Sequence, residues 1–330
     1  MSCFFIINPN AGRKHGDIRG RIERFFAGRK LRFEIEFTRA REHASELSAR
    51  AVLAGFARIV AVGGDGTIRE TAIPLIRKDA ALGILPCGSG NGLARNLYIP
   101  LDFNAALEGL VKWSPRTVDA GLANGRPFFC VAGVGLDAEV ARDFNSLGSR
   151  RGILPYVWYA ARRILAYKPA KAAVCVDGRR LELLALINSV FNGAQYGGGA
   201  RMAPGAYIDD GLLDLVSIKK TSLPRLLAAL PALFGGTLHK HSDIYSVFQG
   251  KIIELDCGGG SWYHLDGEDF YSQDGKLKFT VLPSVLRVIA PEQSLQKGNY
   301  TGSQNSGVRI QNSPRIGLQK SRRRHPHSDS

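Results

Sequence analysis

The sequence lacks the cysteine patterns of a disulfide framework or a zinc site. Its five cysteines are scattered along 330 residues, and no two of them form a Cys-x-x-Cys pair. An odd number of scattered cysteines is typical of reduced thiols inside a cell. We therefore expect a cytoplasmic protein whose cysteines stay free.

Long apolar runs are also missing. No run reaches the roughly eighteen apolar residues that a membrane span needs, and the nearest, Leu223–Phe234, is interrupted by Pro224 and Pro231. The apolar stretch Cys3–Ile7 is too short for a signal peptide and indicates a first strand. We expect a protein that is soluble or peripheral to a membrane.

Acidic residues are too few to balance the basic ones. The net charge is +15 and the sequence pI about 9.8, which suits nucleic acid, acidic membranes and phosphorylated substrates alike. The aromatic and basic pattern of a recognisable nucleic-acid-binding fold is absent, so we expect no nucleic-acid partner. Residues 297–330 carry seven Lys and Arg against one Asp. We predict that 296–330 is a basic, disordered tail.

Strand and helix patterns alternate through residues 1–118. The predicted strands cover 4–7, 31–37, 59–62 and 82–85, and the predicted helices cover 17–27 and 43–55, with two more beginning after Thr67 and at Gly92. Repeated strand–helix units predict an open α/β domain with a parallel sheet and helices on both faces. Ligands of such sheets bind outside the carboxyl ends of the strands.

After residue 118 short strands alternate with glycine turns. They are predicted at 128–134, 172–176, 181–188, 212–218, 251–255, 263–265 and 277–282, with helical inserts at 152–167 and 223–234. This pattern is typical of an antiparallel β domain. We place it at 119–282 and expect residues 283–295 to complete the first domain.

The motif Gly63-Gly64-Asp65-Gly66-Thr67 stands between a predicted strand and a predicted helix. Glycines let a backbone approach phosphates, and the N–H groups of a helix start point at the anion. A carboxylate beside phosphates requires a cation between them, so Asp65 indicates Mg²⁺ with a nucleotide. The alternative is a turn that merely needs glycine. No GxxxxGK[ST] phosphate loop is present.

Three further motifs carry polar residues. Leu85–Arg95 repeats the strand, glycine loop and helix order and offers a second phosphate or ribose contact. Asp137, in Gly133-x-Gly135-x-Asp137, either helps to hold a metal or substrate or is a structural acceptor. Asp266-Gly267-Glu268 alone would indicate a hairpin turn. His264 either lines the same cleft as Asp266 or is a packed side chain.

Taken in order along the chain, these motifs resemble those of the diacylglycerol kinase catalytic family, which includes bacterial lipid kinases and the sphingosine and ceramide kinases. The resemblance covers roughly residues 3–290. It rests on Asn8-Pro9-x-x-Gly12, Gly63–Thr67, Leu85-Pro86-x-Gly88-Ser89-Gly90-Asn91, Gly133-x-Gly135-x-Asp137-Ala138, Asp209-Asp210-Gly211-x-Leu213-Asp214 and Asp266-Gly267-Glu268.

The resemblance implies a fold, a reaction and a set of site residues. The fold is an N-terminal α/β nucleotide-binding domain with a C-terminal β-sandwich domain for a lipid substrate. The implied catalytic residues are Asp266, as general base for the lipid hydroxyl, with Glu268 and Asp65. Mg²⁺ would be held by the carbonyls of Tyr207 and Leu212 and the carboxylate of Asp210. The implied ATP contacts are Asn8, Pro9, Asn10, Ala11, Gly12, Thr38, Gly63, Gly64, Asp65, Gly66, Thr67, Ile68, Arg69, Glu70, Gly88, Ser89 and Asn91.

The lipid and the mode of membrane contact stay open. Ser89 stands where the bacterial pattern usually has Thr, which favours a sphingoid base without excluding diacylglycerol. A peripheral membrane contact is expected, either through the Trp-, Tyr- and Arg-containing segment 151–163 or with that segment as an ordinary packing helix. The sequence leaves a homodimer open. Two alternative functions remain: an NAD kinase-like enzyme, which shares Gly-Gly-Asp-Gly, and a non-enzymatic basic membrane or nucleic-acid binder.

Overall fold

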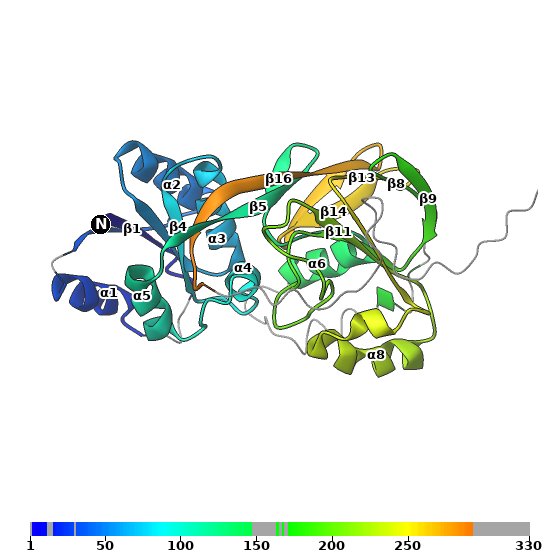
Figure 1. Cartoon of the computed structure of the whole chain (residues 1–330), viewed down its shortest axis with the longest axis horizontal. Coiled ribbons are helices and arrows are strands. Elements are labelled where there is room, and N and C mark those ends of the chain that lie inside the picture. The colour runs from blue at the N-terminus through cyan, green and yellow to red at the C-terminus, as the bar shows by residue number, and fades with distance from the viewer. Residues whose placement is uncertain are drawn as a thin grey trace, which may run out of the picture.

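The computed structural model describes residues 2–11, 16–29, 31–146, 163–164, 167 and 171–292. Within them the chain forms two domains that lie side by side and share a long pair of strands (Figure 1). The predicted ATP contact Gly12, most of the predicted helix 152–167 and the predicted tail 296–330 lie outside the described residues.

The N-terminal domain is an open α/β fold, as predicted. Its parallel strands follow the order β2-β1-β3-β4, and Figure 1 shows α1 and α5 on one side of them with α2 and α3 on the other. Asp17 and Asp102 cap α1 and α5 by accepting the N–H groups of Gly20 and Ala105. The elements are β1 Ser2–Ile7, α1 Ile18–Ala27, β2 Arg32–Phe37, α2 His43–Leu53, β3 Arg58–Gly63, α3 Asp65–Ala72, η2 Ile73–Leu75, β4 Ala81–Pro86, α4 Gly92–Asn96 and α5 Phe103–Lys112.

The C-terminal domain is a β-sandwich, which confirms the fold class. An antiparallel sheet of order β12-β11-β10-β7-β14-β15 packs on the far part of the first sheet, where β16, β13, β8 and β9 lie. Phe128, Leu215 and Phe279 are fully buried in the core between them. The elements are β5 Pro115–Ala123, β6 Arg126–Phe128, β7 Val131–Gly135, α6 Leu136–Ser146, β8 Lys171–Val176, β9 Arg179–Leu184, β10 Ile187–Phe191, β11 Leu213–Ile218, α8 Leu223–Gly235, η3 Leu238–Lys240, β12 Tyr245–Gly250, β13 Ile252–Asp256, β14 Ser261–Leu265, β15 Glu268–Ser272 and β16 Lys276–Ile289.

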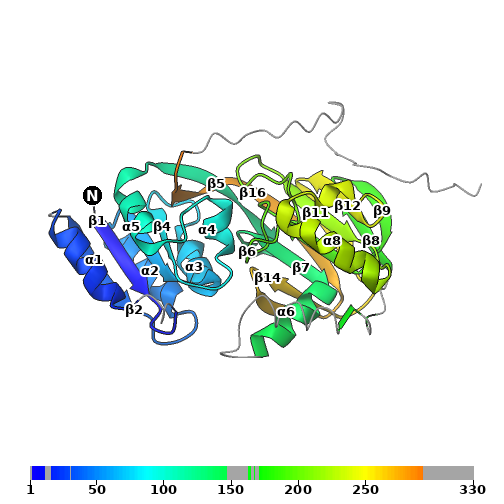
Figure 2. The same ribbon diagram turned by 90° about the horizontal axis from the view of Figure 1, so that it is seen from below.

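Strands β5 and β16 run as an antiparallel pair from one domain into the other (Figures 1 and 2). The first half of β16 pairs with β13 in the sandwich, whereas Val288 pairs with Leu82 of β4 in the parallel sheet. The pairing of β5 with β16 shifts register between Leu282 and Leu286, and Ser284 there has a φ of 52°. The chain thus leaves the first domain along β5 and returns to it along β16.

Two predicted strands are each broken in the structure. The prediction over 128–134 is wrong at Phe129 and Cys130, whose N–H groups donate to the Asp266 carboxylate instead of to a neighbouring strand. The prediction over 181–188 is wrong because the chain changes sheets there, from β9 in the first sheet to β10 in the second. No helix among the described residues is long and apolar enough to cross a membrane.

Candidate active site

The predicted nucleotide loops meet at the carboxyl edge of the parallel sheet. Asn8 N–H donates to Val62 O, Thr38 N–H donates to Ile7 O, and Cys87 N–H donates to Gly63 O. The Asn8 side chain also donates to Thr67 Oγ1 across 3.1 Å. The four loops that follow β1, β2, β3 and β4 therefore lie next to one another.

The two glycine motifs pack directly against each other. A Cβ atom at Gly88 would lie 2.6 Å from Gly64 Cα, so the two backbones approach too closely for any side chain there. Asn91, with φ of 50°, closes the second loop by accepting the Gly88 N–H and donating to the Gly88 carbonyl. Part of the glycine requirement is therefore structural, as the alternative interpretation of the motif held.

Asp65 connects the two loops. Its carboxylate accepts the Asn91 N–H at 2.9 Å and the Gly92 N–H at 2.6 Å, where α4 begins. Burial raises the pKa of Asp65, and the nearby charge of Asp266 raises it further. Helix α3 starts at Asp65 itself, inside the glycine motif, so its first turn faces the edge where the loops meet.

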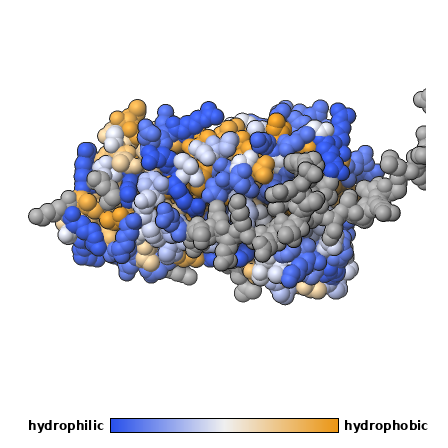
Figure 3. Space-filling model, viewed as in Figure 1, coloured by the Kyte–Doolittle hydropathy of each residue, from blue (hydrophilic) through white to orange (hydrophobic). Residues whose placement is uncertain are grey.

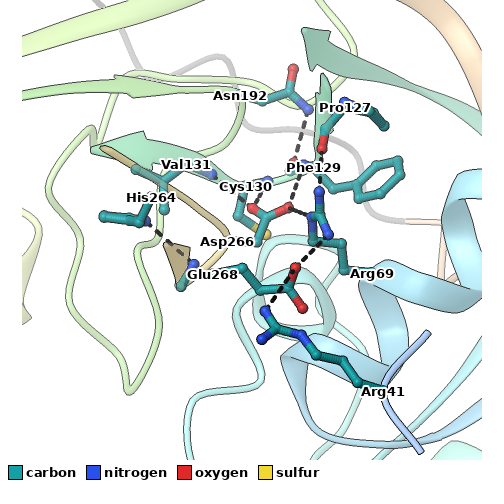
Figure 4. Close-up of polar contacts among 11 residues, drawn as sticks. Arg41, Arg69, Pro127, Phe129, Cys130, Val131, Asn192, His264, Asp266 and Glu268 are labelled. Carbon is teal, nitrogen blue, oxygen red and sulfur yellow. Dashed lines mark hydrogen bonds and ion pairs between the residues drawn. The ribbon is translucent and has the colours of Figure 1, made fainter. Parts of the chain in front are cut away.

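Asp266 occupies a tight hairpin turn between β14 and β15. Asp266 and Gly267 both have positive φ values, 50° and 91°, as a two-residue Asp-Gly turn requires. The Asp266 carboxylate accepts three backbone N–H groups, from Phe129 at 2.8 Å, Cys130 at 2.8 Å and Val131 at 3.1 Å (Figure 4). The turn is thus a hairpin, as its sequence alone indicated, and it is tied firmly to the start of β7.

Arg69 joins this hairpin to the first domain. From α3 its guanidinium donates to Glu268 at 2.8 Å and to the Pro127 carbonyl at 3.2 Å, and its Nε lies 4.0 Å from Asp266 (Figure 4). The Arg69 side chain is only 9% exposed. Predicted as an ATP contact, Arg69 has its guanidinium directed at the two predicted catalytic carboxylates of the second domain.

A cavity of about 220 Å³ lies beside this ion pair, between α2, α3 and β15. Glu70, a predicted ATP contact, accepts the Ala44 N–H there, and burial raises the pKa of Glu70. The lining residues are Glu42, Ser45, Glu46, Arg69, Glu70, Ile73 and Glu268. Glu42 and Glu46 carried no recognisable motif, so sequence reasoning missed them.

Asp137 belongs to a buried polar network. Its carboxylate accepts hydrogen bonds from Ser189 at 2.5 Å and Tyr196 at 2.9 Å, and it lies 3.2 Å from His264 Nε2. Burial by itself would raise the pKa of Asp137, but these partners hold it below its usual range. The structure therefore favours the structural interpretation of Asp137.

His264 connects this network to the hairpin turn at Asp266 and Gly267. It is fully buried, and its Nδ1 accepts the Gly267 N–H at 3.3 Å. A Cβ atom at Gly133 would collide with both Asp137 Oδ2 and His264 Nε2. The first glycine of the Gly-x-Gly-x-Asp motif is thus required because a side chain there would occupy the space of the Asp137–His264 contact.

The predicted Mg²⁺ ligands lie in the turn before β11. Leu212 N–H donates to Asp210 at 3.0 Å. Desolvation, with a smaller effect from the charges of Asp119 and Asp209, raises the pKa of Asp210 to about 6. A cation would relieve this crowding of negative charge, so the donor set suits Mg²⁺.

Asp119 was not predicted, although its carboxylate holds the same turn by accepting the N–H groups of Gly211 and Ser284. Within the described ranges no three His, Cys, Asp or Glu side chains converge as a metal-binding group. The predicted site, with one carboxylate and the carbonyls of Tyr207 and Leu212, stays a prediction.

Comparison with known proteins covers most of the chain. The diacylglycerol kinase catalytic domain matches residues 2–123, and the YegS C-terminal NAD kinase beta sandwich-like domain matches residues 130–290. A protein of Pseudomonas aeruginosa strain UCBPP-PA14, named "Probable lipid kinase YegS-like", is 35% identical over 81% of this chain and 87% of its own. A namesake from Pseudomonas fluorescens strain Pf-5 is 33% identical over 79% of this chain and 86% of its own.

Solved structures have a similar overall fold. The crystal structure of a diacylglycerol kinase from Bacillus anthracis strain Sterne superposes with a TM-score of 0.67 at 19% identity, covering 88% of this chain and 97% of that one. The order of the motifs, the two matched domains and the identity to the Pseudomonas proteins agree. The chain therefore belongs to the diacylglycerol kinase catalytic family, a family of lipid kinases.

Proposed function

We propose that this protein transfers the γ-phosphoryl group of ATP to the hydroxyl of a membrane lipid, either diacylglycerol or a sphingoid base. The observation that carries the proposal is the contact of Arg69 with Glu268 and Asp266. It places the glycine loops of one domain opposite the carboxylates of the other. Phosphoryl transfer needs this juxtaposition of an anion-binding backbone and an acceptor for the hydroxyl proton.

In this proposal the phosphates lie over the first turn of α3, whose N–H groups suit an anion, and beside Ser89 and Gly90, since the Gly88 and Asn91 N–H groups are already bound within the protein. Mg²⁺ supplies neutralisation of phosphate charge when bound, and Asp210, with the carbonyls of Tyr207 and Leu212, would hold a structural Mg²⁺. The lipid approaches from the β-sandwich side as a substrate at a membrane surface. Nucleic acid has no part in this reaction.

Two carboxylates compete for the role of general base. A carboxylate has about four acceptor positions, and three backbone N–H groups occupy those of Asp266, which leaves one for the lipid hydroxyl. Asp65 accepts two N–H groups and burial raises its pKa, but it lies between the two glycine loops of the first domain, on the side proposed for the nucleotide, whereas Asp266 comes from the domain proposed for the lipid. We assign the base to Asp266 and the joining of the loops to Asp65.

The test is phosphate transfer from labelled ATP with Mg²⁺ to diacylglycerol, sphingosine, ceramide and phosphatidylglycerol in mixed micelles. We expect one labelled lipid, no turnover in Asp266→Asn, and ATP binding by that variant close to wild type. The thermal melt of the variant is the control, because an Asn amide would face the N–H groups that Asp266 accepts. Labelling of NAD instead of lipid would contradict the proposal, and equal loss of ATP binding and turnover in a folded variant would refute the general-base role.

A further inference from the structure

Helix α8, Leu223–Gly235, exposes a face without a polar side chain. Leu227 and Phe234 are 48% and 43% exposed, and Pro224, Ala228 and Pro231 are exposed as well. These residues are three or four positions apart, so they share one face of the helix. A helix at a water-facing surface normally carries charged and polar residues on that face.

The opposite face of α8 already holds the helix on the domain. Ala229 and Ala232 are buried, and Leu226 and Leu233 pack against the hydrophobic core. Arg225, the sole charged residue of the helix, pairs with Asp243 at 2.7 Å. In Figure 2 the helix lies at the front of the second domain, over β11 and β12. Figure 3 shows mainly blue and pale residues, with a few light orange ones, at the lower right of the molecule, where Figure 1 places α8. The apolar outer face is therefore not needed for the core of its own domain.

Basic residues stand at both ends of the helix. From residue 219 to residue 243 the chain has four Lys and Arg and a single acid, the already paired Asp243. Lys220 precedes the helix and donates one hydrogen bond to the Tyr167 carbonyl at 2.7 Å, and Lys240 follows the helix; both are exposed. The exposed Arg201 lies against Gly236 at the end of the helix. An apolar face bordered by cations suits the interface of an anionic bilayer. A second copy of the chain suits this face less well, because a twofold dimer through α8 would bring the basic residues of the two copies close together and make them repel.

A single loop connects α8 to the candidate active site. Arg201 N–H donates to the Leu233 carbonyl of α8 at 2.9 Å, and Gly198 N–H donates to the Gly90 carbonyl at 3.0 Å. Gly90 belongs to the second glycine motif of the first domain. A bilayer in contact with α8 would thus lie next to the loop that borders the nucleotide site.

We propose that the outer face of α8 inserts into the interface of a bilayer that contains anionic phospholipid, while Lys220, Lys240 and Arg201 contact the headgroups. This inference extends the proposed lipid kinase activity by naming the surface that docks on the membrane. The docking itself does not require turnover, so binding and activity can be tested apart.

The test is sedimentation of the full chain with vesicles of phosphatidylcholine containing roughly a third phosphatidylglycerol. We expect the vesicle affinity of Leu227→Glu/Phe234→Glu to fall by about tenfold or more, because a charged carboxylate replaces each inserted apolar side chain. The matched control is Leu53→Glu, at a leucine that is 89% exposed at the end of α2 in the other domain, and we expect it to bind as wild type does. Lys240→Glu should weaken binding to these vesicles at low salt and leave binding to pure phosphatidylcholine unchanged.

Three outcomes would overturn the proposal. The first is wild-type vesicle binding by the double variant with an unchanged thermal melt. The second is equal loss of binding in Leu53→Glu. The third is a change of the double variant from dimer to monomer in light scattering while vesicle binding persists, which would make α8 an interface between copies. Activity separates this proposal from the proposed function: the double variant should phosphorylate monomeric short-chain lipid normally and vesicle lipid poorly, whereas a wild type that phosphorylates no lipid would refute the kinase assignment alone.

Discussion

At the scale of single residues, a few backbone N–H groups and one buried histidine orient the Asp266–Gly267 hairpin turn. Asp266 is oriented by backbone N–H groups, and Gly267 by the buried ring of His264. His264 in turn rests on Asp137, in space that Gly133 leaves open. Together these contacts limit where the Asp266 carboxylate can lie.

Gly133→Ala should therefore destabilise the protein by about 1–3 kcal/mol, because the new methyl group collides with a close-packed Asp–His pair. Urea denaturation measures the change. Gly235→Ala is the control, since its Cβ would meet nothing closer than Thr237 Oγ1 at 3.9 Å. Equal stability of the two variants would show that the Asp137–His264 contact adapts without cost.

Asp210 leads to a prediction about metal. If it helps to hold Mg²⁺, saturating Mg²⁺ at about a hundred times its dissociation constant should stabilise the wild type by about 2.7 kcal/mol and Asp210→Asn by much less. Thermal melts with and without Mg²⁺, in the absence of ATP, provide the measurement. Asp102→Asn is the control, because it changes a carboxylate of the first domain at which Asn can also cap α5. An equal Mg²⁺ response in Asp210→Asn would rule out its carboxylate as a ligand.

At the scale of elements, helix α3 has two duties. Its N-terminus belongs to the glycine motif, and its Arg69 reaches the β14–β15 hairpin in the other domain. Helix α3 therefore fixes the position of the glycine loops relative to the β14–β15 hairpin.

A double-mutant cycle with Arg69→Met and Glu268→Gln should give a coupling energy of about 1–3 kcal/mol, because the pair is largely shielded from water. Chemical denaturation of the four proteins gives this number. The exposed pair Arg50–Glu36 supplies the comparison and should couple by less than about 1 kcal/mol. Equal coupling energies in both cycles would show that the Arg69–Glu268 pair stabilises the protein no more than an exposed ion pair does.

Much of this arrangement follows from local sequence. The parallel strands and the Asp-Gly turn were predicted, because short apolar runs indicate strands and turn residues indicate turns without any distant contact. Helices α5 and α6 and strands β5, β6, β12 and β15 were missed. The break at Phe129 was also missed, because it depends on the carboxylate of Asp266, 137 residues away. The partners of Asp137 come from three separate strands and loops, so only the folded chain could identify them.

At the scale of the whole molecule, the strand pair β5–β16 belongs to both domains. Leu286 and Val288 of β16 are fully buried in the first domain, while Phe279 of the same strand is fully buried in the second. We therefore expect a substitution in one half of β16 to change the stability of both domains.

Leu286→Ala should cost about 2–5 kcal/mol and shift the unfolding of both domains together. Tryptophan fluorescence can follow this with variants that keep either Trp113, on the first domain, or Trp262, on β14 of the second. Two coincident transitions are expected in urea. Unfolding of the Trp113 signal alone, with the Trp262 signal unmoved, would mean that the domains fold independently.

The path of β16 also has a consequence for synthesis on the ribosome. In the first domain β16 lies between β4 and β5, so the parallel sheet is incomplete until residues near 289 have emerged. By then the entire sandwich has been translated. During that interval β4 presents an unpaired edge, the kind of surface that other chains or a chaperone recognise. The N-terminal domain is translated before the sandwich, but its sheet cannot be completed until the sandwich has been translated as well.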